Sequence, residues 1–183
     1  MNKYISILRG INVSGQKLIK MADLKELYES LNFKNVQTYI QSGNVIFCSE
    51  LKNYDEIISL IETAIEKNYN FTVPVQLLTQ QKLEKIVEQN PFAQKGNCDI
   101  TKLHVTILNK IPDKKLIENL ESIEFGKDEF IIEKDVIYLH IPESYGNTKL
   151  NNNFFENKLK VKATTRNWKT TNKLFELIAK TIC

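Results

Sequence analysis

A glycine-bracketed loop near the start of the chain is the first segment whose residue types could do chemistry. Residues 9–17 read Arg-Gly-Ile-Asn-Val-Ser-Gly-Gln-Lys, after an apolar run and before a helical pattern. Gly10 and Gly15 have the GxxxxG spacing of a phosphate loop. However, Lys17 comes one residue late, and Leu18 stands where Ser or Thr would bind Mg²⁺. The loop therefore does not match a nucleoside triphosphate site.

The same loop suits a simpler anion better. Arg9, Asn12 and Lys17 place a guanidinium, an amide and an ammonium group close together in the sequence. Guanidinium groups and backbone N–H groups are the usual partners of phosphate and carboxylate. We therefore predict an anion-binding loop here. The alternative is a turn whose glycines only permit a positive φ.

Two further polar segments are candidates for the same ligand. Ser42 and Asn44 flank a glycine between two strand-like runs, in a pattern typical of a hairpin turn. Arg166, Asn167 and Trp168 precede the last helical pattern. The predicted ligand-binding residues are thus Arg9, Asn12, Lys17, Ser42, Asn44, Arg166, Asn167 and Trp168.

The charge distribution raises a second possibility, a nucleic-acid surface. The net charge of +3 hides an excess at the end of the chain, where residues 149–183 hold eight basic and two acidic side chains. In residues 158–173, lysines and an arginine accompany Trp168, the only tryptophan, which could stack on a base. Alternation of Lys158, Lys160 and Lys162 also fits a solvated edge strand, and a tryptophan at a helix start is commonly a packing anchor.

No catalytic or metal-binding pattern stands out. The chain lacks GxSxG, HExxH and paired-carboxylate motifs, so we predict no catalytic residues, no metal and no cofactor, and we leave open whether the protein is an enzyme. The two histidines, His104 and His140, fall on strand-like runs that could be neighbours. With no carboxylate or cysteine evident on those strands, we interpret them as polar residues on an open sheet face.

Composition indicates an ordinary packed protein. The 183 residues are 42% hydrophobic and 26% charged, and no run reaches the roughly 18 apolar residues of a membrane span. The N-terminus has no signal-peptide pattern. Cys48, Cys98 and Cys183 form no CxxC pair, so we interpret them as reduced thiols, with Cys48 in the core. We expect a soluble, cytoplasmic protein with no membrane partner.

Periodicity predicts the same order of elements twice. The first half has strands at 4–8, 36–40, 45–48 and 73–78 and helices at 21–32, 53–65 and 79–90. The second half has strands at 103–108, 130–132, 136–141 and 161–164, a helix beginning near 113, a short helix at 154–159 and a terminal helix marked by 174–182.

The order predicts an α+β protein of two tandem ferredoxin-like (α-β plait, βαββαβ) subdomains, each followed by an extra helix. We place the subdomains at 1–91 and 92–183, with the connection at 92–99. We further expect the hairpin at 41–44 to lie at the sheet end opposite the loop at 9–17.

Several of these segments resemble one bacterial family. Leu8-Arg9-Gly10-Ile11-Asn12-Val13, Ser42-Gly43-Asn44-Val45 and Thr165-Arg166-Asn167-Trp168 are similar to the signature of the domain of unknown function 1697 family, and the similarity spans nearly the whole chain. The resemblance implies a cytoplasmic bacterial protein of two ferredoxin-like subdomains, and it implies no activity.

The function is therefore open among three hypotheses. The first is binding of a small phosphate- or carboxylate-bearing ligand at the strand-to-helix loops. The second is a nucleic-acid-associated protein that uses residues 158–173, and the third is a structural interaction module without a ligand. The oligomeric state is not determined by the sequence.

Overall fold

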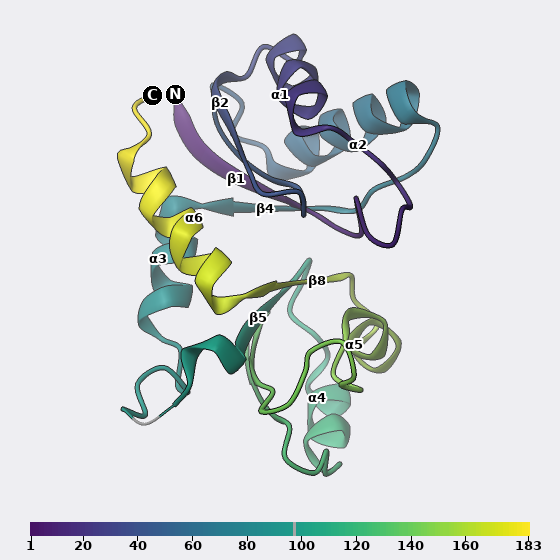
Figure 1. The fold of residues 1–183 in the computed structure, drawn as a ribbon, viewed down its shortest axis with the longest axis vertical. Coiled ribbons are helices and arrows are strands. Elements are labelled where there is room, and N and C mark those ends of the chain that lie inside the picture. The colour runs from purple at the N-terminus through teal and green to yellow at the C-terminus, as the bar shows by residue number, and fades with distance from the viewer. Residues whose placement is uncertain (97) are drawn as a thin grey trace. The chain divides into compact units, whose positions relative to one another are not determined.

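The apolar runs pair into two four-stranded antiparallel sheets in the computed structural model, which describes residues 1–96 and 98–183 (Figure 1). The first sheet has the order β2-β3-β1-β4 and the second the order β6-β7-β5-β8. Six α-helices accompany them within the described residues. The predicted order of elements is confirmed in both halves.

The elements of the first half are β1 (Asn2–Leu8), α1 (Met21–Ser30), β2 (Lys34–Tyr39), β3 (Asn44–Ser49), α2 (Tyr54–Tyr69), β4 (Val75–Thr79) and α3 (Gln80–Glu88). Those of the second half are β5 (Leu103–Leu108), α4 (Lys114–Glu121), β6 (Glu129–Glu133), β7 (Val136–His140), α5 (Asn152–Leu159), β8 (Ala163–Asn167) and α6 (Trp168–Lys180). A short 3-10 helix, Ile100–Lys102, precedes β5.

The chain divides into two compact units whose boundaries differ from the predicted ones. The first unit comprises Met1–Glu84 and Lys173–Cys183, and the second comprises Lys85–Asn172. Both divisions fall inside a helix, α3 or α6. An amphipathic pattern shows that a helix has an apolar face but does not show which sheet that face contacts. Asn97, within the predicted connection, lies outside the described residues.

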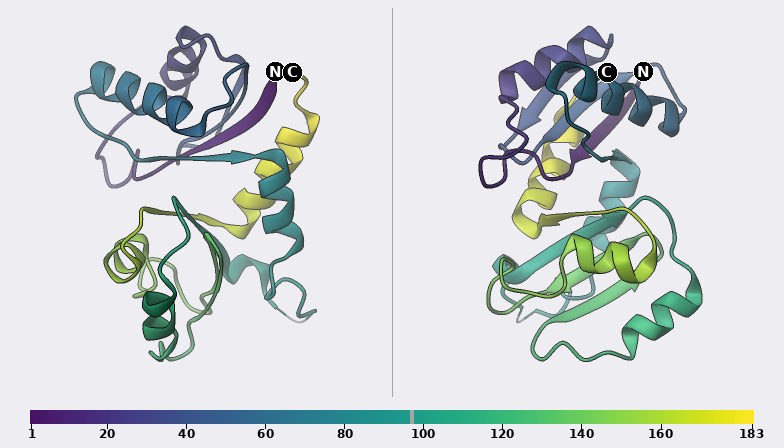
Figure 2. Two further views of the ribbon diagram at one scale, coloured as in Figure 1. Left: turned by 180° about the vertical axis from the view of Figure 1, so that it is seen from behind. Right: turned by 90° about the vertical axis from the view of Figure 1, so that its right-hand side faces the viewer.

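In the first unit, helices α1 and α2 cover one face of the sheet (Figure 2). Leu24 and Tyr28 of α1 and Ile61 of α2 pack in one cluster with residues of β1 and β3, including Phe47. Tyr28 is buried, and its hydroxyl lies 2.7 Å from the hydroxyl of Ser6. Burial therefore raises the pKa of Tyr28 above its usual value, because the phenolate would lose its hydration.

In the second unit, the equivalent face carries α4 and α5. Leu120 of α4 and Phe155 of α5 pack against Ile137 and Leu139 of β7. The predicted strand at 161–164 is displaced, because Lys160 ends α5 in a left-handed conformation and the strand begins only at Ala163. Lys158, Lys160 and Lys162 therefore do not form one edge strand.

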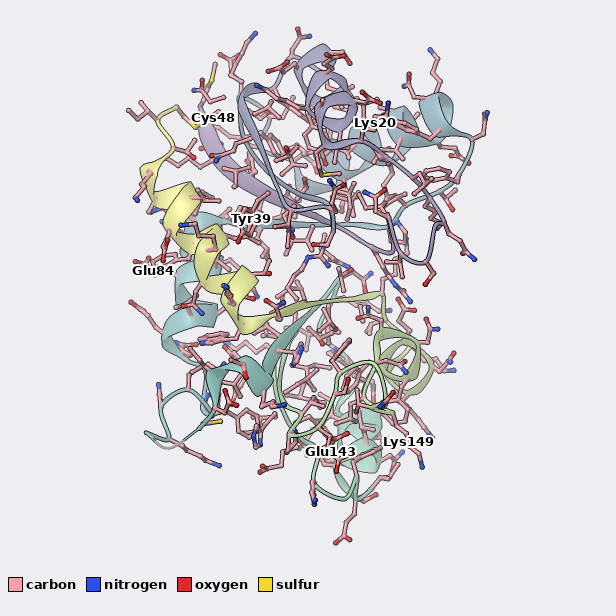
Figure 3. All side chains as sticks on the ribbon, in the orientation of Figure 1. Lys20, Tyr39, Cys48, Glu84, Glu143 and Lys149 are labelled. Atoms are coloured by element: carbon pink, nitrogen blue, oxygen red, sulfur yellow. A yellow bond between two sulfur atoms is a disulfide. The ribbon has the colours of Figure 1, made fainter. Side chains whose placement is uncertain are left out.

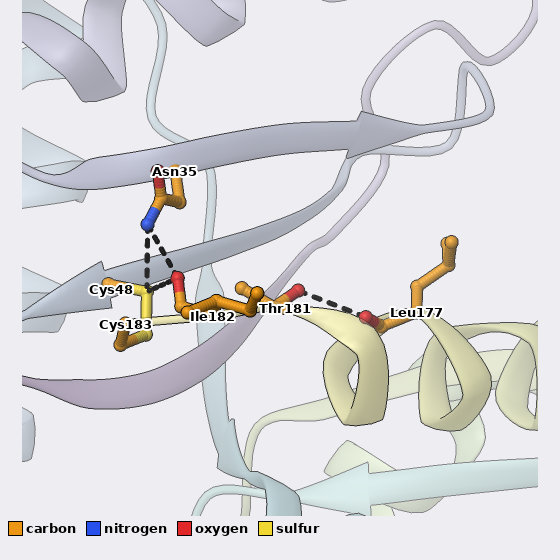
Figure 4. Close-up of a disulfide and its surroundings, with 6 residues drawn as sticks. All are labelled: Asn35, Cys48, Leu177, Thr181, Ile182 and Cys183. Atoms are coloured by element: carbon orange, nitrogen blue, oxygen red, sulfur yellow. Dashed lines mark hydrogen bonds between the residues drawn. A yellow bond between two sulfur atoms is a disulfide. The ribbon is translucent and has the colours of Figure 1, made fainter.

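A disulfide corrects the prediction that all three cysteines are reduced. Cys48 of β3 is bonded to Cys183 at the end of the chain, and Cys98 is the free cysteine (Figure 4). The segment after α6 has further contacts beside the bond, since the Asn35 Nδ2 donates to the Ile182 carbonyl at 2.6 Å. Cys48 is fully buried, as predicted. No spacing rule could find a pair separated by 135 residues.

Candidate functional site

Three loops of the first unit meet at the end of the sheet where β1 stops. They are the β1–α1 loop (9–20), the β2–β3 turn (40–43) and the α2–β4 loop (70–74). The antiparallel register explains this, since Ile7 of β1 pairs with Asn44 of β3, and Leu8 pairs with Val75 of β4. The expectation that the hairpin lies at the opposite end from the β1–α1 loop is therefore wrong. We call these three segments the loop end.

Asn12 ties two of the loops together. Its Oδ1 accepts from the Ile19 N–H at 2.9 Å, and its Nδ2 donates to the Ile19 carbonyl at 2.9 Å and to the Gln41 carbonyl at 2.8 Å. Both protons of the amide are thus donated to backbone carbonyls. Asn12 also has φ +56°, a left-handed conformation that asparagine tolerates better than most residues. The side chain therefore builds the loop rather than offering its amide to a ligand.

Arg9 and Lys17 connect the β1–α1 loop to the α2–β4 loop. The Arg9 N–H donates to the Pro74 carbonyl at 3.0 Å, and the Lys17 Nζ donates to the Thr72 carbonyl at 2.7 Å. Because a carbonyl oxygen carries no formal charge, this hydrogen bond does not neutralise the ammonium group. The ammonium is thus held in place by a neutral acceptor.

The Ser-Gly-Asn segment closes the β2–β3 turn. Asn44 is fully buried, and its Nδ2 donates to the Tyr39 carbonyl at 3.0 Å and to the Ser42 Oγ at 3.1 Å. Gly43 has φ +74°, and a Cβ there would lie 2.6 Å from Ile11 Cδ1 and 2.8 Å from Leu8 Cβ. The turn therefore packs directly on the β1–α1 loop, and this segment is structural.

The loop end carries positive charge without carboxylates of its own. Its three segments contain Arg9, Lys17 and Lys20 and no Asp or Glu (Lys20 is labelled in Figure 3). The backbone is left-handed at five positions between residues 10 and 17, namely Gly10, Asn12, Ser14, Gly15 and Lys17. Lys20 is the N-cap residue of α1 and makes no side-chain capping bond. Cations and backbone donors thus occupy the same short stretch of chain.

The predicted residues of the second unit have mainly structural contacts. Asn167 accepts from the Thr170 N–H at 2.7 Å and so caps α6. Trp168 is only 6% exposed, which makes it a packing residue rather than a stacking platform. The Arg166 Nη1 donates to the Thr165 carbonyl at 2.9 Å, and burial lowers the pKa of Arg166 to about 10. Arg9 and Arg166 belong to different units.

The two histidines lie on opposite faces of the second sheet, against the expectation that they stand side by side. His104 pairs with Leu139, and His140 pairs with Leu103, so their side chains alternate. A carboxylate is nevertheless present, on β6. Glu129 pairs with His140 in the β6–β7 register, and its Oε1 lies 2.9 Å from the His140 Nδ1.

His140 and Glu129 line a pocket that sequence reasoning missed. Its volume is about 740 Å³, and Phe92, Lys95, Cys98 and Lys102 also line it. A signal for the pair did exist. Lys134-Asp135 forms a two-residue turn between the predicted strands at 130–132 and 136–141, and counting outward from it places residue 129 opposite residue 140.

Neither a metal centre nor a membrane helix is found in the described part of the chain. Within residues 1–96 and 98–183, no group of three His, Cys, Asp or Glu side chains is arranged to hold a metal ion. None of the helices described there is long and apolar enough to cross a bilayer.

Comparison with known proteins supports the fold and indicates no activity. A family model described as "Protein of unknown function (DUF1697)" matches residues 1–138. Among solved structures, the conserved bacterial protein SP0830 from Streptococcus pneumoniae is similar, with a TM-score of 0.78 and 24% identity over 98% of this chain and 99% of that one. This likeness shows that the two share a fold. A search of curated proteins finds no match.

Proposed function

The chain belongs to the DUF1697 family of proteins of unknown function, and we propose that it binds a small phosphate- or carboxylate-bearing anion at the loop end of the first unit. One observation carries this proposal. Three cationic side chains, Arg9, Lys17 and Lys20, come from the β1–α1 loop, which contains no carboxylate and is bonded to the two neighbouring loops. The Lys17 ammonium is held by the Thr72 carbonyl, and guanidinium and ammonium groups are the usual partners of such anions.

The geometry divides the predicted ligand-binding residues by role. Arg9, Lys17 and Lys20 supply charge, whereas Asn12 and Asn44 hold the loops with amide groups that are bonded to backbone. Ser42 belongs to the turn through its contact with Asn44. We therefore restrict the proposed site to the first unit and give Asn167 a capping role. The nucleic-acid alternative loses its stacking residue, because Trp168 is buried.

We propose in addition that each unit is a ferredoxin-like plait of a cytoplasmic bacterial protein. Element order βαββαβ and a sheet order in which the first and third strands are central neighbours support the plait in both units. The location remains a prediction, and the Cys48–Cys183 disulfide is unusual for a reducing compartment.

Titration calorimetry with inorganic phosphate and with acetate tests the anion site. Lys20→Gln removes one charge of the loop end without removing a capping bond of α1, and we expect it to weaken phosphate binding about tenfold, the usual effect of one charge-assisted contact. Lys52→Gln is the matched control, because Lys52 is an exposed lysine of the same unit in the β3–α2 segment, at the other end of the sheet. Equal affinities of the two variants, or no binding by the unmodified protein, would leave the loops with a structural role only.

A further inference from the structure

The pocket of the second unit combines groups that the loop-end proposal does not use. It lies where β5 and β6 begin and β7 ends, and Phe92, Lys95, Lys102, Glu129 and His140 line it. A concave site with apolar walls and a few convergent polar groups is the usual form of a small-molecule site. Contacts with neighbouring residues hold Phe92, Lys95, Lys102 and His140 in place.

Two flat side chains form one wall. The Phe92 and His140 ring centroids are 5.8 Å apart, with the ring planes inclined by 37°. Phe92 is held by the turn that follows α3, in which its N–H donates to the Asn90 Oδ1 at 3.0 Å. Phe92 is only 2% exposed, so it supports the wall from behind, and the His140 ring presents the face on which a flat apolar group can pack.

Glu129 sets the orientation of His140. A carboxylate oxygen at 2.9 Å from Nδ1 accepts the proton of that nitrogen, which makes Nε2 the acceptor of the neutral ring. The His140 side chain is 23% exposed, so the ring remains accessible from the pocket side. His140 can therefore accept a hydrogen bond through Nε2.

Two lysines, Lys95 and Lys102, line the pocket together with the carboxylates of Asp99 and Glu129. The Lys95 Nζ lies 5.2 Å from the centre of the Phe92 ring, and the Lys102 Nζ donates to the Glu143 carbonyl at 3.1 Å (Glu143 is labelled in Figure 3). Neither forms a salt bridge within the described residues. A ligand anion would supply the missing partner.

The other polar groups of the pocket are already engaged or unsuited to react. The Asp99 Oδ1 accepts from the backbone N–H and the hydroxyl of Thr101. Burial, together with the charges of Asp99 and Glu129, raises the pKa of the Cys98 thiol. A protonated thiol is a poor nucleophile, so Cys98 contributes surface rather than chemistry.

We propose that this pocket is a second binding site, for a small molecule that carries a flat apolar group next to an anionic group. The apolar group lies against the His140 ring, which Phe92 supports from behind, and the anionic group faces Lys95 and Lys102. Glu129 is a positioning residue, because it acts through His140. The site is independent of the loop end, whose residues belong to the other unit.

Imidazole ¹⁵N spectroscopy tests the proposal, since the chain has only two histidines and both lie in the second unit. Phenyl phosphate should shift the His140 signals saturably, and inorganic phosphate should bind about tenfold more weakly, because it lacks the apolar group. His104 is the internal control, as its ring stacks on Tyr145 with centroids 4.5 Å apart. A His140 signal that is unmoved by phenyl phosphate, or that responds equally to both anions, would overturn the proposal.

Variants separate the roles of the lining residues. Lys95→Gln should weaken phenyl phosphate binding about tenfold, whereas Lys110→Gln, an exposed lysine outside the pocket, should leave it unchanged. Equal effects of the two would contradict a specific site. Glu129→Gln should change the ¹⁵N tautomer pattern of His140 and leave that of His104 alone. An unchanged pattern would remove Glu129 as the positioning residue.

Discussion

Replacing Cys183 with serine opens the covalent loop that the disulfide closes in the first unit. Cys48 lies in β3, next to the central strand β1, and Cys183 is the last residue of the chain, so the bond closes a loop over 135 residues of sequence separation. Without the bond, only weaker contacts such as the Asn35–Ile182 hydrogen bond hold the segment after α6 to β2. The change mainly increases the conformational entropy of the unfolded chain, because residues 48 and 183 are no longer joined.

The magnitude follows from the length of the loop. The chain-entropy relation, −2.1 − 1.5R ln n cal/mol/K, gives about 5 kcal/mol at 25 °C for a loop of this length, and removal of native disulfides usually costs about 2–5 kcal/mol. We therefore expect Cys183→Ser to lower the free energy of unfolding of the first unit by about 2–5 kcal/mol.

Urea unfolding, followed by hydrogen exchange of the β1 and β3 amides, measures the effect. Cys98→Ser is the matched control, because Cys98 is a free thiol of the second unit and its loss should leave these amides unchanged. Dithiothreitol added to Cys98→Ser should reproduce the Cys183→Ser result. Equal protection in Cys183→Ser and in the unmodified protein would refute the reasoning, as would three titratable thiols in the unmodified protein after non-reducing denaturation.

Two further predictions concern the first unit. Gly43→Ala should lower the free energy of unfolding by about 2–4 kcal/mol in urea titrations, since it adds a Cβ 2.6 Å from Ile11 Cδ1 at a position with φ +74°; Gly15→Ala, with open space around its Cβ, should cost less. Tyr28, whose pKa is raised by burial, should contribute stability that is fully present below pH 10 and is lost above it, because the unfolded chain ionises first. Tyr28→Phe should abolish its share of that alkaline loss in urea titrations between pH 8 and pH 11, and an unchanged slope would contradict this assignment.

The two hairpins show which structural features the local sequence predicts. Asn44 ends a turn that was predicted correctly, yet the place of that turn in the unit was predicted wrongly. An antiparallel β3 must begin where β1 ends, which brings Gly43 against Ile11. The same rule applied to the turn at Lys134-Asp135 yields the Glu129–His140 pair. Both results follow from strand direction and from the position of the turn, which the sequence contains.

The asparagines show where residue type alone misleads. Amide groups at strand-to-helix loops suggest a ligand, but Asn12, Asn44 and Asn167 all satisfy backbone groups. A loop that turns sharply leaves backbone donors and acceptors unpaired, and an asparagine side chain can reach them without a change in fold. Which role such a residue has depends on the loops that come close to it in space.

The sequence by itself determined the order of strands and helices and the family of this protein. These properties depend on the periodicity and the local motifs of neighbouring residues. Only the tertiary structure decided that the chain returns to the first unit at Lys173, that Cys48 meets Cys183, and that Phe92 and Lys95 join His140 in a pocket. These contacts join residues that are distant in sequence, and such contacts form only when the whole chain has packed, so no local pattern records them.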